Sequence, residues 1–239
     1  MSLDRSRYWI YGTHAVQHAL VNPHRTVHEI LYTQTTDLSL FNLKKKATLT
    51  DKPSLARLLG SDAVHQGIAA SVSPLPSLSL ENLEDFSENQ LVMILDQVSD
   101  PHNVGAILRT CAVFGVKALI LTDRHAPNES GVLAKTACGA LEHVAMMRVT
   151  NLAQALTTLK KKGFWTVGLA ESGKKTLSSI NWKGKMAIIM GAEGDGMRDL
   201  TQKHCDLLAH LETSPEFTTL NVSNAAAIAL YEGFKGQRL

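Results

Sequence analysis

Cysteine is scarce in this sequence of 239 residues, which contains only Cys111, Cys138 and Cys205. Three widely spaced cysteines exclude a disulfide framework and any Cys-x-x-Cys metal or redox pair, and we expect buried, apolar thiols. Long apolar runs are also missing, since the runs at 91–95 and 186–190 fall far short of the ~20 residues of a membrane span. The first residues lack the apolar segment of a secretory signal, so we expect a cytoplasmic protein without a membrane partner.

Neither charge sign dominates, because 24 Lys and Arg residues stand against 22 Asp and Glu residues, a net charge of +2. A charge this small neither requires nor excludes a nucleic-acid partner. Its distribution is more informative, since residues 73–90 carry four acidic residues, no basic residue and two prolines. This stretch has the composition of a solvated linker, so we predict an N-terminal domain at 1–73, a linker at 74–90 and a larger domain at 91–239.

The sequence does contain an alternation of short apolar runs and helical patterns, which is typical of an α/β protein. In the larger domain this alternation predicts a mostly parallel sheet covered by helices on both faces. The N-terminal domain shows a shorter version of the pattern, which predicts a small α/β domain. The expected strands are 27–32, 67–72, 91–95, 118–121, 164–169 and 186–190, and the expected helices are 15–21, 54–59, 104–114, 152–162 and 225–234.

Three polar clusters in the larger domain lie where strands give way to helices, the place where open α/β sheets bind ligands. They are Asp96 to Arg109, the glycine-rich segment 191–196 and the segment 219–224. Each also has a simpler structural interpretation, with Asn103 as one helix N-cap, Asn221 or Ser223 as another, and the glycines in an exposed turn. Three such clusters in one domain favour a shared site over three coincidences.

Metal and dinucleotide sites find little support in the sequence. His14 with His18, and His24 with His28, have i,i+4 spacing, but no third ligand accompanies either pair, so we expect no metal. The segment GAEGDG lacks the Gly-Lys-Ser/Thr of a P-loop, and its place after a late strand differs from that of the dinucleotide fingerprint.

Read together, the clusters resemble the three signature motifs of the SpoU family, RNA ribose 2′-O-methyltransferases of the SPOUT class. The matching segments are LDQVSDPHNVGAILRTCAVFGV, IIMGAEGDGMRDLTQKHCD and LNVSNAAAIALYE. In the N-terminal domain, YGTHAVQHAL and AVHQGIAASV resemble the substrate-binding domain of the bacterial 23S rRNA guanosine methyltransferase subgroup. The resemblance therefore extends over nearly the whole chain.

This resemblance implies a C-terminal SPOUT domain with a parallel sheet and a deep trefoil knot, and a small N-terminal α/β domain of the ribosomal-protein L30e-like type. It also implies S-adenosylmethionine as cofactor and a homodimer whose site uses both chains. Carried onto this sequence, the cofactor would contact Gly191, Leu211 and Leu220. The methyl-transfer site would be lined by Asn103, Arg109, Glu193, Thr219 and Asn221.

The implied reaction is attack of a ribose 2′-hydroxyl on a sulfonium methyl, for which the enzyme must position two partners and help to remove a proton. The family proposal makes Arg109 the general base, yet a guanidinium has a pKa above ~12 and is ordinarily a pure donor. A bidentate clamp on the target phosphate is the alternative, and the sequence leaves both roles open. Thr219 stands where the family usually has serine, which keeps the hydroxyl and adds a methyl.

The sequence thus predicts ribose 2′-O-methylation of structured RNA, with a guanosine of 23S rRNA as the expected target. A tRNA ribose methyltransferase is the alternative within the class, and the N-terminal domain argues against it. A non-catalytic RNA-binding or ribosome-assembly factor is the alternative from another class, disfavoured by the intact Asn103, Arg109, Glu193 and Asn221. A Rossmann dehydrogenase is a more distant alternative, disfavoured by the placement of the glycines.

Overall fold

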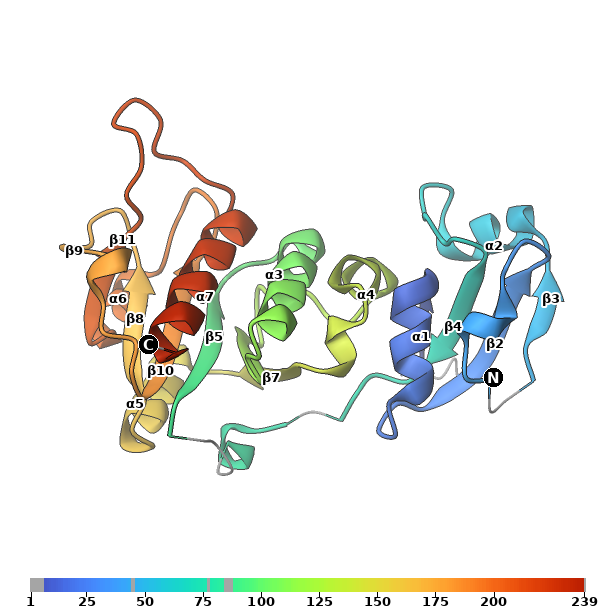
Figure 1. Cartoon of the computed structure of the whole chain (residues 1–239), viewed down its shortest axis with the longest axis horizontal. Helices are drawn as coiled ribbons and strands as arrows, with labels where there is room; N and C mark the ends of the chain where they lie inside the picture. Colours follow the sequence, from blue (N-terminus) through green and yellow to red (C-terminus); the bar gives the residue numbers. More distant parts are fainter. Residues whose placement is uncertain (1–6, 44–45, 77, 84–87, 239) are drawn as a thin grey trace. The chain divides into compact units, whose positions relative to one another are not determined.

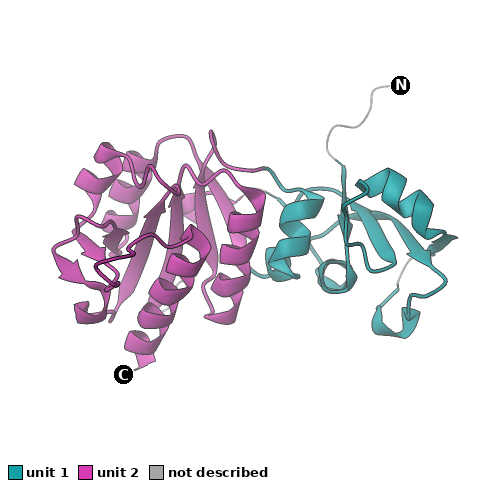
Figure 2. Ribbon diagram, turned by 90° about the horizontal axis from the view of Figure 1, so that it is seen from above, with its two compact units in different colours: residues 1–76, 128–143 teal, residues 77–127, 144–239 magenta. Residues whose placement is uncertain are grey.

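The structure, a computed structural model, describes residues 7–43, 46–76, 78–83 and 88–238. The chain divides into two compact units, unit 1 with residues 1–76 and 128–143 and unit 2 with residues 77–127 and 144–239 (Figure 2). No helix among the described residues is long and apolar enough to cross a membrane.

Unit 1 is built on a mixed four-stranded sheet with the order β1-β4-β2-β3 (Figure 1). β4 pairs antiparallel with both β1 and β2, while β3 pairs parallel with β2. Leu55 of α2 is fully buried against Tyr11 and Ala69, whereas α1 packs on β1 and β4. The elements are β1 (Tyr8–Tyr11), α1 (Thr13–Val21), β2 (Val27–Thr33), η1 (Leu38–Leu40), β3 (Thr48–Thr50), α2 (Lys52–Leu59), β4 (Ile68–Val72), α4 (Gly131–Ala137) and η3 (Ala140–Glu142).

Residues 128–143 belong to unit 1, although the sequence predicted 91–239 as one continuous domain. Helix α4 packs against β1 and α1. A Cβ on Gly131 would lie 2.5 Å from the carbonyl oxygen of Trp9, so the missing side chain lets α4 lie directly against β1, an edge strand of the sheet. An edge strand covered in this way is protected from pairing with another chain.

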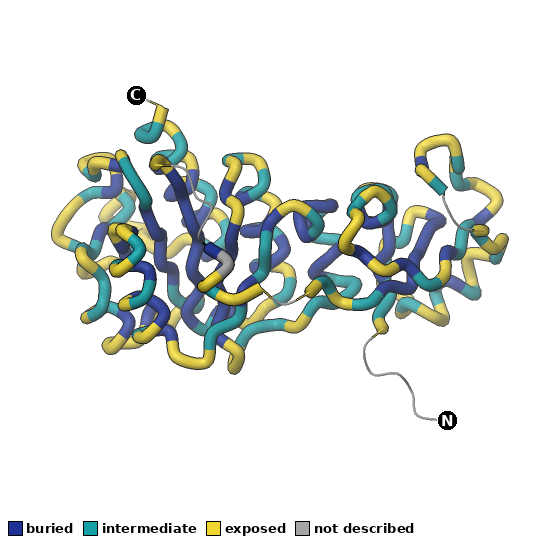
Figure 3. The backbone as a smooth tube through the Cα atoms, turned by 90° about the horizontal axis from the view of Figure 1, so that it is seen from below, coloured by how far each residue is buried: buried dark blue, intermediate teal, exposed yellow. Residues whose placement is uncertain are grey.

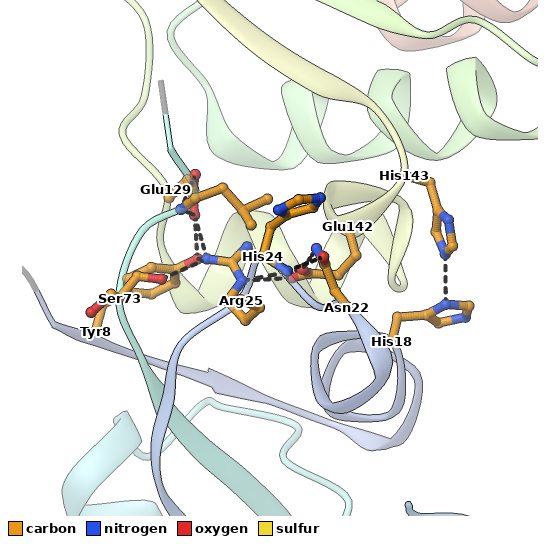
Figure 4. Close-up of polar contacts among 10 residues, drawn as sticks. Tyr8, His18, Asn22, His24, Arg25, Ser73, Glu129, Glu142 and His143 are labelled. Atoms are coloured by element: carbon orange, nitrogen blue, oxygen red, sulfur yellow. Dashed lines mark hydrogen bonds and ion pairs between the residues drawn. The ribbon is translucent and has the colours of Figure 1, made fainter. Parts of the chain in front are cut away.

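A buried arginine ties this segment to the rest of unit 1 (Figure 4). The Arg25 side chain has no exposed surface, and it lies 2.8 Å from Glu142 through Nη2 and 2.9 Å from Glu129 through Nη1. Arg25 Nη1 also donates to the carbonyl of Ser73 at 2.8 Å, and the hydroxyl of Tyr8 donates to Glu129 at 2.7 Å. Both carboxylates come from residues 128–143, so the charge of Arg25 is compensated only when that segment is in place.

Unit 2 contains a seven-stranded sheet with the order β7-β6-β5-β10-β8-β11-β9, in which every pair is parallel. The predicted parallel sheet is therefore confirmed. Alternate residues of β5 face opposite sides of the sheet. Val92 and Ile94 pack in one core cluster with buried residues of α5, whereas Leu91 lies against Gly233 of α7. Both faces are covered, and Figure 3 shows the buried stretches concentrated along the strands.

The elements of unit 2 are η2 (Leu80–Asn82), β5 (Gln90–Asp96), α3 (Pro101–Val113), β6 (Ala118–Thr122), β7 (Ala145–Val149), α5 (Leu152–Lys161), β8 (Trp165–Leu169), β9 (Lys175–Thr176), η4 (Leu177–Ser179), β10 (Lys185–Gly191), α6 (Asp199–His204), β11 (Leu207–His210) and α7 (Val222–Arg238). Every element expected from the sequence is present. Those that the sequence did not predict are short, such as β1, β3, α4, α6, β7 and β11. Cys111 is buried as expected, whereas Cys138 and Cys205 are only partly buried.

The predicted linker at 74–90 is solvated only in part. Leu83 is 2% exposed and packs in the same core cluster as the inner face of β5, and Leu80 packs against that cluster. Glu84 and Asp85, which carry half of the acidic charge of this stretch, lie outside the described residues. Leu80 and Leu83 therefore anchor this segment on unit 2.

Candidate functional site

The carboxyl ends of β5 and β10 carry the first two polar clusters, and the sheet places these ends side by side. Asp96, the last residue of β5, is the register partner of Gly191, the last residue of β10. The chain order reverses at this point, because β6 and β7 extend the sheet beyond β5 while β8 and β11 lie beyond β10. Such a switch point is where open α/β sheets bind ligands.

Helix α3 begins at this edge with a cap that the sequence interpretation misplaced. The carboxylate of Asp100 accepts hydrogen bonds from the backbone N–H groups of His102 at 3.0 Å and Asn103 at 3.4 Å, which makes Asp100 the N-cap. Pro101 occupies the first helical position, where a missing N–H is tolerated. Asn103 as N-cap is therefore wrong, and its side chain remains available for another partner.

The glycine-rich segment after β10 forms a tight turn that presents Glu193. Ala192 and Gly196 exchange backbone hydrogen bonds of 3.1 and 2.9 Å, which close the turn. A Cβ on Gly191 would lie 1.9 Å from the carbonyl carbon of Gly196, so no side chain fits at residue 191. Gly194 has a φ of +84°, a conformation that glycine adopts without strain.

An ion pair between the exposed Arg198 and a buried carboxylate fixes the far end of this turn. The side chain of Asp96 has no exposed surface, and it accepts from Arg198 at 3.1 Å through the backbone N–H, 2.9 Å through Nε and 2.8 Å through Nη2. Charge-assisted bonds of this kind are among the stronger ones in proteins. Arg198 was not predicted as a site residue, and the available signal was its position directly after GAEGDGM.

Asn221 brings the three predicted clusters together. Its Nδ2 atom donates to Oδ1 of Asn103 at 3.1 Å and to Oε2 of Glu193 at 3.2 Å. Its Oδ1 atom accepts from the backbone N–H of Ser223 at 2.9 Å and from the Ser223 hydroxyl at 2.6 Å, so Asn221 also caps α7. The cap interpretation of Asn221 is therefore confirmed, and the cap orients the amide N–H₂ toward the other two clusters.

A cleft of about 500 Å³ adjoins this triad, a volume usual for small-molecule sites. Gln97 and His125, which line it, have φ values of 63° and 60°, a strained conformation for residues other than glycine. Strain of this kind concentrates at functional sites, and no sequence signal pointed to either residue. The cleft is lined by Gln97, Val98, Ser99, Asp100, Asn103, His125, Ala192, Glu193, Asp195 and Val222.

Arg109, in contrast, is not part of this triad. It lies six residues after Asn103 on α3, which places it about 9 Å farther along the axis and roughly 120° around the helix. Its side chain is exposed, and it has no ion-pair partner among the residues that the structure describes. Arg109 shares its face of α3 with the exposed Val113, beside the exposed Ile228 and Tyr231 of the neighbouring helix α7.

The residues predicted to contact a cofactor lie at the same edge of the sheet. Gly191 ends β10 and Leu211 follows β11, with β8 between these two strands. Neighbouring strands are about 4.8 Å apart, so the three strand ends form one short ledge. Leu220 and Thr219 are both exposed on the connection between β11 and α7.

A second close backbone approach borders this ledge. A Cβ on Gly173 would lie 2.4 Å from the carbonyl carbon of Ala209, and the carbonyl of Gly173 accepts a 2.8 Å hydrogen bond from His210. Residues 170–173 thus fold over the end of β11. Exposed backbone and small residues at several strand ends fit a ligand held by main-chain groups, such as a nucleoside cofactor. The sequence prediction missed this segment.

Two protein families match separate parts of this chain. The SpoU rRNA Methylase family matches residues 90–231, and a second family, RNA 2′-O ribose methyltransferase substrate binding, matches residues 9–78. A Synechocystis protein described as an uncharacterized tRNA/rRNA methyltransferase is 37% identical over 242 residues, 95% of this chain and 62% of that protein. The 23S rRNA (guanosine-2′-O-)-methyltransferase RlmB of Pasteurella multocida is 38% identical over 93% of this chain and 96% of its own length.

A solved structure has the same fold. The SpoU methyltransferase AviRb from Streptomyces viridochromogenes, in complex with the cofactor AdoMet, superposes with a TM-score of 0.81 at 18% identity, covering 97% of this chain and 90% of that chain. At this level of identity the match establishes the fold alone. The family matches and the identity to curated relatives establish more, and the chain belongs to the SpoU rRNA methylase family.

Proposed function

We propose that this protein transfers a methyl group from S-adenosylmethionine to the ribose 2′-hydroxyl of a guanosine in 23S rRNA. The observation that carries the proposal is the junction of Asn103, Glu193 and Asn221, one residue from each family motif, beside a cleft at the switch point of the sheet. The relative named for this reaction, which covers the chain almost end to end, supports the choice of substrate.

Within the triad, Asn221 acts as a positioning residue for the other two. Its amide holds one carboxylate oxygen of Glu193, which leaves the other oxygen free to accept a hydrogen bond from the target hydroxyl. Asn103 is oriented by the same amide and has its own N–H₂ group free to donate toward the cleft. Fixed donors and acceptors of this kind accelerate a reaction mainly by orientation.

The strand-end ledge would hold the cofactor, with Gly191, Leu211 and Leu220 against it and residues 170–173 at its border. S-adenosylmethionine, when bound there, supplies an electrophilic methyl group. This chain provides backbone close to the ligand at Gly191, where no side chain fits. Thr219, next to Leu220, is exposed and can offer its hydroxyl to the RNA.

We further propose a homodimer that adds Arg109 to the site of the second copy. Val113 is 69% exposed, Ile228 44% and Tyr231 51%, so α3 and α7 together present an apolar strip that a second copy would cover. Arg109 emerges from the same face of α3 and is distant from the triad of its own chain. In the partner's site it would clamp the target phosphate, or act as the base that the family proposal assigns to it. Tyr231→Asp should make the protein monomeric in light scattering and inactive.

The two family matches support separate roles for an N-terminal RNA-binding part and a C-terminal methyltransferase part. The small mixed sheet of unit 1 supports the proposed ribosomal-protein L30e-like fold, and the match to the SpoU rRNA methylase family supports the proposed trefoil knot. Pulling on residue 90 and the C-terminus in an optical trap would test the knot, because a knotted chain extends less than its full contour length.

The decisive experiment measures transfer of labelled methyl from S-adenosylmethionine to unmodified 23S rRNA and, separately, to unmodified tRNA. We expect label on one guanosine ribose of 23S rRNA, and its loss in Asn221→Ala with cofactor binding retained. Label only in tRNA would keep the chemistry and overturn the substrate. Cofactor and RNA binding without transfer, in free rRNA and in assembly intermediates, would favour a non-catalytic assembly factor.

A further inference from the structure

A cluster of hydrogen-bond donors at one end of the unit 1 sheet takes no part in the site proposed above. It consists of Lys52, His65, Gln66 and Lys135, and we call it the Lys135 cluster. Lys52 begins α2, His65 and Gln66 precede β4, and Lys135 lies on α4. Lys135 is contributed by the part of the chain that the SpoU methylase family matches, although it belongs to unit 1.

The centre of the cluster is held in a defined geometry. Lys135 Nζ donates to Oε1 of Gln66 at 2.6 Å, and the same oxygen accepts from the backbone N–H of Thr13 at 3.1 Å. A Cβ on Gly12 would lie 2.4 Å from Lys135 Nζ, so a side chain at residue 12 would displace Lys135 from this position. The oxygen of Gln66 is thereby occupied, and its N–H₂ group can donate outward to a ligand.

The backbone at Gln66 is strained in order to make this arrangement. Gln66 has a φ of 55° and Gly67 a φ of 82°, two consecutive residues in the left-handed region. The backbone N–H of Gly67 donates to Nδ1 of His65 at 3.0 Å, so Nδ1 is the acceptor and the Nε2–H of His65 is left as a donor. Residues held in such sparsely populated backbone conformations cluster at active sites and ligand-binding sites.

The charges of the cluster all have the same sign. No carboxylate within the described residues pairs with Lys135, and burial is the main cause that lowers its pKa. After burial, the charges of Lys52 and Lys135 are the causes that lower the pKa of His65. A cluster that combines hydrogen-bond donors with positive charge is suited to an anion.

We propose that the Lys135 cluster binds the phosphodiester backbone of the RNA substrate. Its donors come from three separate elements, an arrangement that suits a polyanion contacting several groups better than a single small ion. This inference rests on the proposed function for the identity of the RNA. It adds that a segment of the methyltransferase match, residues 128–143, provides the central lysine of the RNA-binding surface on unit 1.

The test compares Lys135→Gln with Lys117→Gln in the full-length protein. Lys117 is an equally charged, exposed control just before β6, at the opposite edge of the unit 2 sheet from the cleft. We expect Lys135→Gln to weaken RNA binding about 3- to 10-fold and to reduce the slope of log affinity against log salt by about 1, because one phosphate contact is lost. The KM for RNA should rise while kcat and the KM for S-adenosylmethionine stay unchanged, and Lys135→Arg should recover most of the affinity.

Three outcomes would overturn the proposal. They are an RNA affinity of Lys135→Gln equal to that of Lys117→Gln, a loss of kcat without a change in the KM for RNA, or an effect on inorganic phosphate binding with none on RNA. A fall in melting temperature that Lys135→Arg shares would indicate a structural role instead. If the protein binds RNA through Lys135 but transfers no methyl group, the RNA-binding role of the Lys135 cluster is supported and the proposed function fails. The two proposals can therefore be distinguished.

Discussion

Removing one charge from the Arg25 network would test whether the two chain segments of unit 1 fold as one. In Glu142→Gln, the carboxylate that accepts from Arg25 Nε and Nη2 at 2.8–3.1 Å becomes a neutral amide. The side chain of Arg25 is fully buried and that of Glu142 is 3% exposed, so water cannot replace the lost partner. Breaking a buried pair costs about 3 to 5 kcal/mol, and because Glu129 still faces Nη1, we expect a loss of about 3 kcal/mol.

The free energy of unfolding is measured by urea denaturation, and hydrogen exchange of peptides from residues 8–33 and 128–143 locates the loss. Lys160→Met is the control, because it breaks the ion pair between Lys160 and Asp206. These two side chains are 34% and 20% exposed, so the loss of the pair should cost less than about 1 kcal/mol. A cost for Glu142→Gln no larger than that of the control would refute the reasoning, as would a loss of exchange protection confined to unit 2.

Four further results are expected. A fragment of residues 7–76 should be unfolded by circular dichroism, because it lacks both carboxylates that face Arg25, and co-expressed 128–143 should restore its structure. Burial, followed by the charges of His143 and His14, lowers the pKa of His18. The stability due to its neutral form is therefore present above pH ~6.5 and lost as the pH falls through the lowered pKa. In urea denaturation between pH 7.5 and 5.5, the free energy of unfolding of His18→Gln should depend less on pH than that of the wild type. Gly191→Ala should reduce kcat at least about 100-fold, because its Cβ displaces the turn that carries Glu193, and activity near wild type would contradict this. Burial raises the pKa of Cys205 to about 12, so mass spectrometry should find this thiol unalkylated by iodoacetamide at pH 8 until the protein is denatured.

The interior strands were predictable because they are buried on both faces. β5 and β10 read as continuous apolar runs, and helices with a clear period alternate with the strands. β7 and β11 were missed for the same physical reason, since β7 lies at an edge of the sheet and β11 next to the other edge, and both are only partly buried. The apolar runs inside these two strands are only three residues long, Ala145 to Met147 and Leu207 to Ala209, which is too short to stand out in the sequence.

The membership of residues 128–143 in unit 1 could not be predicted from local sequence. The partners that hold this segment, Arg25 and Tyr8, are more than 100 residues away in the chain. Its own pattern is rich in small residues, among them Gly131, whose function is to let α4 approach the carbonyl of Trp9. A domain boundary drawn from composition assumes that each domain is continuous in sequence, whereas the compact unit 1 combines two separate segments of the chain.

For Asn221, the sequence offered a structural role and a role in the site as alternatives, and the structure shows that one side chain has both contacts. Asn221 was either a helix cap or a member of the site, and its two ends do both, since Oδ1 caps α7 while Nδ2 contacts Asn103 and Glu193. Because the cap uses Oδ1 as its acceptor, it fixes the direction in which the Nδ2 donors point. The helix cap therefore orients the amide group at the site. Asn103 differs because Asp100 already caps α3, and this leaves the whole amide of Asn103 to the site. A polar residue at a helix start is therefore informative about function only once its competing cap has been identified, and that requires distances that a sequence does not contain.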